Sequence, residues 1–426
     1  FARQNSGTAI TNFDIPAALL ASVAGSTGNA IDVIAPDFEI PSDWKASIRF
    51  DHELNLNRFG FNLGDGYNFS AQYLYTAPRD AFIWTNLAQT ELAAALPTGV
   101  APDGRTIYAD LDDLGIRNLT ELGNADGSDS HVFSVSLAKE YDNGFGFFVS
   151  YAYQDIQYVS EGNSSRGISS WRGITAIDRN NPEVRTSAYQ TSDAFNVALS
   201  YERDFVSDLT TRFDIFGQIT SGAPYTLTYD VSNSNSLFGR AGDGEGPFDN
   251  NPLYIPLSGA DPRVVYATGF DQTGFSSFVD SIGAARGSIH EVNSAQSAWN
   301  QQWDFRMSQE LPGIPGADRW VGENNFSIVL DVINFPNLLN SDWGTQTNGP
   351  GNGQLGVVRA DLVSAADVAA NGVDGATALT GDAPRTACLA AGDCVYRYNS
   401  YRDSDTAFAS NFNSVYQVRV GLRYEF

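Results

Sequence analysis

Positive charge and long apolar runs are scarce in this sequence. Its 426 residues include 25 Lys and Arg against 50 Asp and Glu, which gives a net charge of −25. A nucleic-acid-binding surface needs clustered basic residues, so this balance argues against nucleic acid as a partner. No segment approaches the ~20 consecutive apolar residues that a membrane-spanning helix needs. The acidic excess predicts negatively charged surface loops, which attract cations.

Cysteine and histidine are nearly absent. The chain has two cysteines, Cys388 and Cys394, in one polar segment, and three histidines spread along its length. Two thiols with no histidine nearby provide too few ligands for a structural zinc site. We therefore expect Cys388 and Cys394 to form a small disulfide at a loop tip, in an oxidising compartment.

Motifs for catalysis are missing as well. The sequence contains no Gly-x-Ser-x-Gly elbow and no histidine placed beside a Ser/Asp pair in an evident catalytic design. We expect no enzymatic activity and no cofactor. Asp110, Asp112 and Asp113 could bind Ca²⁺ through their carboxylates. The alternative is that these three residues belong to a solvated acidic loop.

The last eleven residues show what the chain has instead. Residues 416–426 alternate strictly between an apolar and a polar set, and successive side chains of a strand point to opposite faces. The apolar set is Tyr416, Val418, Val420, Leu422, Tyr424 and Phe426. This pattern is typical of the closing strand of an outer-membrane β-barrel, whose apolar face meets lipid and whose polar face meets the lumen. The last strand of a soluble sandwich is the alternative.

The same alternation recurs along the chain and predicts about nine strands. The expected strands cover residues 44–54, 67–84, 133–138, 145–154, 195–202, 211–219, 299–307, 326–332 and 415–426. Asp142-Asn143-Gly144 predicts a tight hairpin turn between two of them. The side chains that we expect to face lipid most clearly are Phe133, Val135, Leu137, Phe147, Val149, Tyr151, Val418, Val420 and Leu422.

The connections between these strands alternate in length. About ten residues or fewer separate one pair, and about thirty or more separate the next, as in outer-membrane barrels, where the long loops are extracellular. The long polar connections fall before residue 129 and at 160–192, 231–295 and 341–410. We therefore predict an all-β protein, a transmembrane antiparallel β-barrel whose short turns and C-terminus lie on the periplasmic side.

An odd number of strands leaves one edge unpaired. Bacterial single-chain barrels have even strand numbers, and an open edge in lipid is costly because no water replaces the missing hydrogen bonds. The sequence does not open with the charged segment followed by an apolar segment that a signal peptide has. We therefore expect residues 1–426 to be the C-terminal portion of a larger barrel, with further strands supplied by chain before Phe1.

Several short sequence motifs resemble those of one protein family. They are a proline-containing strand entry at 36–44, PDGRTIY (102–108), SGAPYT (221–226), NPLYIP (251–256), DFRMSQELP (304–312), VINFPNLLN (332–340) and WG (343–344). The opening residues 1–9 resemble an extracellular loop of the same family. These motifs follow one another along nearly the whole chain, and together they resemble the Oar-like (OmpA-related) branch of TonB-dependent outer-membrane receptors.

The resemblance implies a fold, a place and a mechanism. The fold is a barrel of about 22 strands around a plug, of which this sequence would hold roughly the last nine or ten. The place is the outer membrane of a Gram-negative bacterium, in contact with lipid and lipopolysaccharide. The mechanism is uptake of an unidentified ligand, energised by a TonB-type complex acting through an N-terminal part. The alternative is a passive porin-like channel or a structural surface barrel.

The resemblance also assigns a role to the chain end. Tyr424 and Phe426 would form the terminal aromatic signal that the barrel assembly machinery recognises. The transported ligand stays open, since receptors of this family take iron chelates, cobalamin, glycans or peptides.

Overall fold

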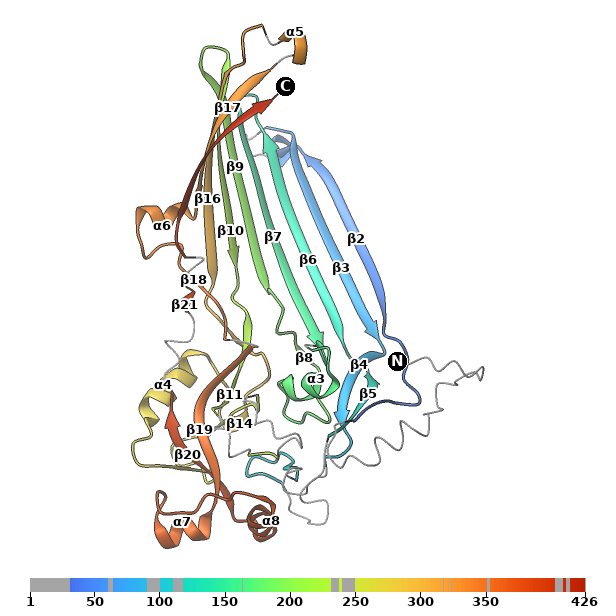
Figure 1. Ribbon diagram of the computed structural model, residues 1–426, viewed down its shortest axis with the longest axis vertical. Coiled ribbons are helices and arrows are strands. Elements are labelled where there is room, and N and C mark those ends of the chain that lie inside the picture. Colours follow the sequence, from blue (N-terminus) through green and yellow to red (C-terminus); the bar gives the residue numbers. More distant parts are fainter. Residues whose placement is uncertain are drawn as a thin grey trace.

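The computed structural model describes residues 31–59, 64–89, 100–109, 118–162, 164–230, 237–239, 250–316, 318–322, 324–350, 353–402, 409–410 and 414–425. β-Strands are the main secondary structure, and the helices are few and short. Two bodies are visible in Figure 1: a tall, curved sheet, and a smaller mixed unit at one of its ends. We call them the long sheet and the head.

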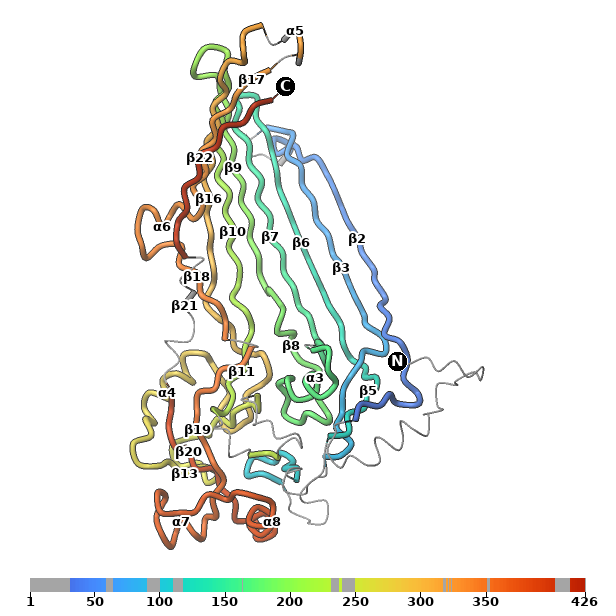
Figure 2. Tube along the Cα trace, viewed as in Figure 1, coloured from blue at the N-terminus to red at the C-terminus, as the bar shows by residue number. Residues whose placement is uncertain are grey.

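The long sheet contains nine long strands among the described residues, antiparallel and in chain order. They are β2 (Ser42–Leu54), β3 (Tyr67–Arg79), β6 (Asp129–Glu140), β7 (Phe145–Tyr158), β9 (Asp193–Val206), β10 (Leu209–Thr220), β16 (Asn300–Pro312), β17 (Asn325–Ile333) and β22 (Gln417–Glu425). The short β8 (Arg185–Thr186) also pairs with β7. Figure 2 shows the long strands running side by side. The prediction of an all-β chain built from these segments is confirmed.

The long connections and the short turns lie at opposite ends of the long sheet. Tight turns join β6 to β7 and β9 to β10 at the end where β22 also finishes, whereas the long connections gather at the other end (Figure 1). The first turn contains Gly144 at φ +83°, where a Cβ atom would lie 2.0 Å from the carbonyl oxygen of Glu202. Glycine is therefore required there, as the Asp-Asn-Gly sequence predicted.

One predicted strand is wrong in its extent. The segment 67–84 is not continuous, because Asp80 adopts φ +56° and ends β3 at Arg79. The next residues form β4 (Ala81–Asn86), which leaves the long sheet. It joins β5 (Leu119–Ala125) and β1 (Ile31–Ile34) in a separate three-stranded sheet beside α3 (Gly167–Gly173). The left-handed backbone at Asp80 changes the direction of the chain, so the strand ends although the alternation of side chains continues.

The head corrects the prediction that the connections at 231–295 and 341–410 are polar loops. Its five-stranded sheet has the order β13-β20-β19-β11-β15. These strands are β11 (Pro224–Tyr229), β13 (Val264–Tyr266), β15 (Ala295–Gln296), β19 (Gln354–Ser364) and β20 (Cys394–Tyr401). Around them lie β12 (Tyr254–Ile255), β14 (Ser288–Ile289), α4 (Gln272–Ser281), α7 (Ala365–Asn371) and α8 (Asp382–Ala391).

The head has a closed hydrophobic core. Leu227, Tyr229, Ile255, Tyr396 and Tyr398 are fully buried in it, and aromatic rings pack against one another throughout. These residues come from connections that are far apart in the sequence, so each apolar run is short and carries no clear period. The core forms only when the runs meet, as in an ordinary globular domain.

The remaining elements lie along the long sheet. At the short-turn end are the 3₁₀ turn η1 (Leu56–Phe59) and α5 (Asp318–Val321). α6 (Phe335–Leu339) follows β17 and projects sideways from the sheet (Figure 1). The two-residue strands β18 (Gln346–Thr347) and β21 (Ala409–Ser410) pair with each other near the head end.

Candidate functional site

One face of the long sheet is apolar across all nine strands. The register places Val135 between Ala71 and Tyr151, and Val149 between Leu137 and Val197. All nine side chains expected to meet lipid therefore point to the same face: Phe133, Val135, Leu137, Phe147, Val149, Tyr151, Val418, Val420 and Leu422. This shared face is what alternation within each strand predicted, extended over the whole sheet.

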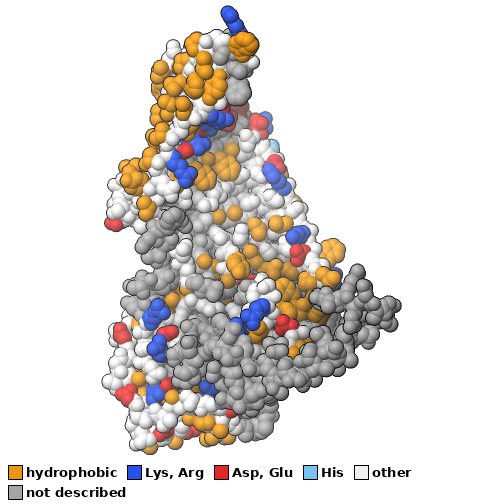
Figure 3. All heavy atoms as spheres, viewed as in Figure 1, with side chains coloured by type: hydrophobic (Ala, Val, Ile, Leu, Met, Phe, Trp, Pro, Cys, Tyr) orange, Lys and Arg blue, Asp and Glu red, His pale blue; other side chains and the backbone are white. Residues whose placement is uncertain are grey.

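This apolar face is also exposed. Val420 is 75% exposed and Leu422 is 68% exposed, although both lie on a regular strand. Figure 3 shows hydrophobic side chains gathered over the part of the sheet where β17 and β22 lie. A contiguous apolar patch of this extent is rare on a monomeric protein in water and marks contact with a partner or a membrane.

Lys139 stands at the short-turn rim of the apolar face, and the alternation pattern gave no sign of its role. It lies on the same side of β6 as Leu137, yet only 9% of it is exposed. Its ammonium group lies 4.2 Å and 4.5 Å from the ring centroids of Tyr67 and Tyr141 and donates a hydrogen bond to the carbonyl oxygen of Asp65. Two cation–π contacts and a hydrogen bond thus compensate for the burial of the ammonium group at this rim.

The opposite face of the long sheet carries charged pairs. Arg306 on β16 contacts Asp331 on β17 at 2.6 Å, and Arg212 on β10 contacts Asp214 at 2.9 Å. Arg419 on β22 is the register partner of Asp331. These side chains line an open hollow of about 550 Å³. Partly exposed ion pairs of this kind add little stability, so the strands do not depend on them to stay together.

A second hollow, of about 280 Å³, lies where the head meets the long sheet. Arg185 and Glu161 stand 4.0 Å apart in its wall, and Tyr189 is 74% exposed at its edge. Burial lowers the pKa of Arg185, and the carboxylates of Glu161 and Glu183 oppose this shift. The combination of a buried cation, a carboxylate and an exposed ring can hold a polar ligand at the mouth of the sheet.

Two buried arginines of the head are paired with aspartates. Arg397 donates two hydrogen bonds to Asp361, at 2.9 Å and 2.7 Å, and two more to backbone carbonyls. Arg105 pairs with Asp103 at 2.5 Å, and its guanidinium lies 4.3 Å from the ring centroid of Phe238. Burial acts to lower the pKa of Arg105, but Asp103 and nearby tyrosines raise it above its usual value. Both arginines are therefore structural members of the head.

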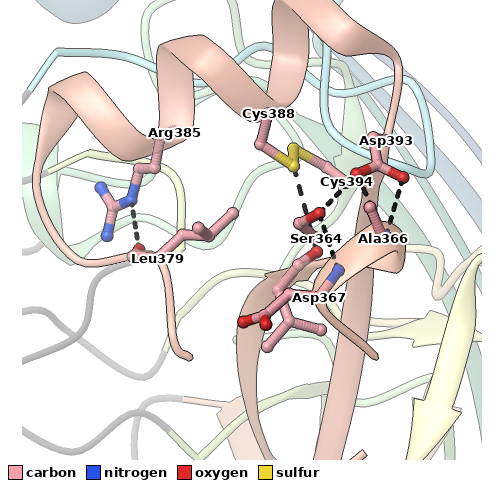
Figure 4. The surroundings of a disulfide bond; sticks show 9 residues. Ser364, Ala366, Asp367, Leu379, Arg385, Cys388, Asp393 and Cys394 are labelled. Carbon is pink, nitrogen blue, oxygen red and sulfur yellow. Dashed lines mark hydrogen bonds between the residues drawn. A yellow bond between two sulfur atoms is a disulfide. The ribbon is translucent and has the colours of Figure 1, made fainter. Parts of the chain in front are cut away.

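The two cysteines form a disulfide, as the sequence predicted. Cys388 lies near the end of α8 and Cys394 begins β20, with their Cα atoms 5.4 Å apart. The expected position at a loop tip is wrong, because the bond joins a helix to a strand of the head. Figure 4 shows Ser364 and Asp393 beside it, where the Ser364 hydroxyl donates a hydrogen bond to the Asp393 carboxylate.

Some predicted site residues lie outside the described residues: Asp110, Asp112, Asp113 and Phe426. The calcium site therefore stays a prediction. Among the described residues, no three His, Cys, Asp or Glu side chains gather in a way that could hold a metal ion. Tyr424, the described half of the expected assembly signal, packs against Phe326 of β17 with ring centroids 4.7 Å apart.

Comparison with known proteins identifies no family for this chain. No protein-family model matches the chain, and no curated protein matches it at a significant level. In the part of the chain that the structure describes, none of the helices is both long enough and apolar enough to cross a membrane.

Proposed function

We propose that this chain is the C-terminal part of the β-barrel of a TonB-dependent outer-membrane receptor of the Oar-like branch. The observation that carries the proposal is the two-sided long sheet. Its exposed face is apolar across nine strands, its other face bears the charged pairs, and its long connections all lie at one end. Outer-membrane barrels share these three properties.

The edges of the long sheet support a larger barrel. Within the described residues, β2 and β22 each pair with only one long strand, and they do not pair with each other. Unpaired backbone N–H and C=O groups in hydrocarbon are costly, so lipid-exposed sheets close into barrels. Further strands between β22 and β2 would complete this sheet in the membrane.

The charged face and the head suggest how a ligand is handled. The head lies at the end of the sheet that we assign to the cell surface, and the hollow beside Arg185 and Tyr189 lies between the two. In the proposed receptor, a ligand meets this region first. It then passes along the face that bears Arg212, Arg306 and Asp331, when a TonB-type complex moves a plug held in an N-terminal part.

Membrane fractionation followed by planar-bilayer recording tests the proposal on the native polypeptide. We expect the protein in the outer-membrane fraction and no constitutive conductance after reconstitution, because a plug fills the lumen of such receptors. Recovery in a soluble fraction would contradict the membrane assignment. Steady open-channel current would instead support the passive porin-like alternative.

A further inference from the structure

The segment 334–344, which contains α6, folds back on itself, and the side chains of Asn334 and Asn337 turn toward its backbone. We call it the α6 loop. The side-chain amide of Asn334 donates to the carbonyl oxygens of Gly344, at 3.0 Å, and Ser414, at 2.9 Å. The amide of Asn337 donates to the carbonyl oxygens of Ser341, at 2.9 Å, and Trp343, at 3.1 Å. Two asparagines thus close the loop through hydrogen bonds from their side chains to the backbone.

The apolar side chains of the α6 loop point outward. Leu338 is 47% exposed, Leu339 is 69% exposed and Trp343 is 54% exposed, and α6 buries none of its residues. Asp342 is the only charged residue between positions 334 and 344. A loop in water would normally place leucine and tryptophan inside and asparagine outside. Here Leu338, Leu339 and Trp343 are exposed together with the polar turn Asn340–Asp342, whereas Asn334 is buried. Large apolar side chains beside a polar turn suit the boundary between hydrocarbon and headgroups.

The loop lies at a defined level of the long sheet. β17 and β22 have nine residues each, which is close to the ~9–11 residues that a tilted strand needs to cross a bilayer. The α6 loop begins directly after β17, and Tyr416, 41% exposed, lies directly before β22. Aromatic residues concentrate at this boundary between hydrocarbon and headgroups.

The apolar surface of the loop continues that of the sheet. Figure 3 shows hydrophobic side chains over β17 and β22, with more of them further along the same edge, where α6 projects in Figure 1. Val415, 54% exposed, lies beside the loop in the chain that leads into β22. This continuity favours lipid acyl chains as the occupant, because acyl chains cover the adjoining apolar face in the proposed barrel.

We propose that the α6 loop inserts Leu338, Leu339 and Trp343 into the outer leaflet of the membrane around the long sheet, and so fixes the height of the sheet in the bilayer. This inference rests on the membrane assignment in the proposed function. It adds a lateral lipid anchor that is not part of the barrel wall.

Environment-sensitive labelling of the native full-length protein in lipid bilayers tests the proposal. An NBD fluorophore is attached at Leu339→Cys, at Val420→Cys on the apolar face and, as an aqueous control, at Thr273→Cys on exposed α4. The native cysteines are paired and do not react. We expect the emission at position 339 to shift to the blue and to be quenched by phospholipids with brominated acyl chains, as at position 420, whereas position 273 is quenched by aqueous iodide.

The possible outcomes separate the two proposals. Iodide quenching at 339 together with lipid quenching at 420 would overturn the lipid anchor and leave the membrane assignment intact. Iodide quenching at 420 would overturn the membrane assignment itself. Protection of 339 from both quenchers would mean that a protein partner or a second copy covers the loop, which also overturns the lipid anchor. Labelling at Leu338→Cys repeats the test with a second variant.

Discussion

The long sheet and the head place their apolar side chains on opposite sides of the backbone. In the long sheet, Val420 and Leu422 are mostly exposed, while the charged pairs occupy the concave face. In the head, Tyr396 and Leu362 are buried within a sheet covered by helices and loops. Both bodies are built from strands of the same chain. The difference shows that a strand pattern sorts side chains into two sets, and that the surroundings decide which set is covered.

Each body also contains an Arg–Asp pair in direct register between neighbouring strands. Arg397 faces Asp361 in the head, with side chains 11% and 12% exposed, and Arg306 faces Asp331 in the long sheet, with side chains 58% and 28% exposed. The two pairs have the same register between neighbouring strands, but the pair in the long sheet is much more exposed to water. Because water screens the second pair, the two pairs should differ strongly in their contribution to stability.

The largest effect is therefore expected at Arg397. Arg397→Met leaves the Asp361 carboxylate buried without its partner and should lower the free energy of unfolding of the head by about 3–5 kcal/mol. Arg306→Met in the long sheet should cost less than about 1 kcal/mol. Hydrogen exchange of the amides of β19 and β20, compared with those of β16 and β17, measures both. Adding Asp361→Leu to Arg397→Met should restore most of the loss, and equal effects of the two single variants would refute the comparison.

The two faces of the long sheet should respond differently to charge. Val149→Arg, on the apolar face, should weaken membrane insertion by about 2–4 kcal/mol. Ser150→Arg, one residue further, should be tolerated because Ser150 lies on the polar face, between Ser136 and Asn196. Folding into lipid vesicles in a urea titration measures the difference. Equal tolerance of the two arginines would contradict the assigned faces.

Mild acid should weaken the head through one buried histidine. His290 is buried in the head, and its Nδ1 atom accepts a hydrogen bond from the backbone N–H of Leu227 at 3.4 Å. Burial lowers the pKa of His290 to about 4. The unfolded chain, with an ordinary histidine pKa, binds a proton that the folded head excludes, so stability is complete above pH ~6.5 and is lost as the pH falls toward 4.

The expected size of this acid effect is roughly 2 kcal/mol between pH 7 and pH 5. Hydrogen exchange of β11 and β12 at the two pH values measures it, after correction for the intrinsic exchange rates. His290→Gln removes the titrating group and should flatten the dependence. If the stability of the head depended on pH equally with and without His290, protonation of His290 would be excluded as the cause.

The smallest effect on folded stability is expected at the chain end. Deleting Phe426 should slow assembly into the outer membrane, if the terminal aromatic residue is the signal that the assembly machinery recognises. The packing of Tyr424 on Phe326 stays in place in this variant. The amount of folded protein in the outer membrane over time, followed by pulse-chase, measures the effect. An unchanged rate and yield would remove Phe426 from the signal.

Much of the long sheet could be predicted from the sequence because its information is local. Alternation along 145–154 and the Asp142-Asn143-Gly144 turn are properties of neighbouring residues, and the structure confirms both. The break at Asp80 was missed, since alternation carries no sign of a left-handed residue inside a strand. Lys139 was also missed, although its position two residues after Leu137 already placed it on the apolar face.

The head could not be predicted in the same way. Its strands meet through pairings such as Thr226 with Gln354 and Val264 with Tyr396, between segments separated by long polar stretches. The α6 loop posed a related problem. Alternation predicted that a strand ends at residue 332, but it gave no sign that Leu338 and Leu339 lie outside a loop closed by Asn334 and Asn337, which only the folded chain shows.

By itself, the sequence determined which segments become long strands, which residues share a face and where the tight turns fall. These properties depend on a period of two residues and on local backbone preferences. The tertiary structure alone decided that the connections build a second core and that the charged rows of neighbouring strands come into register. Those outcomes depend on contacts between distant segments, and no local pattern specifies which distant segment a strand will meet.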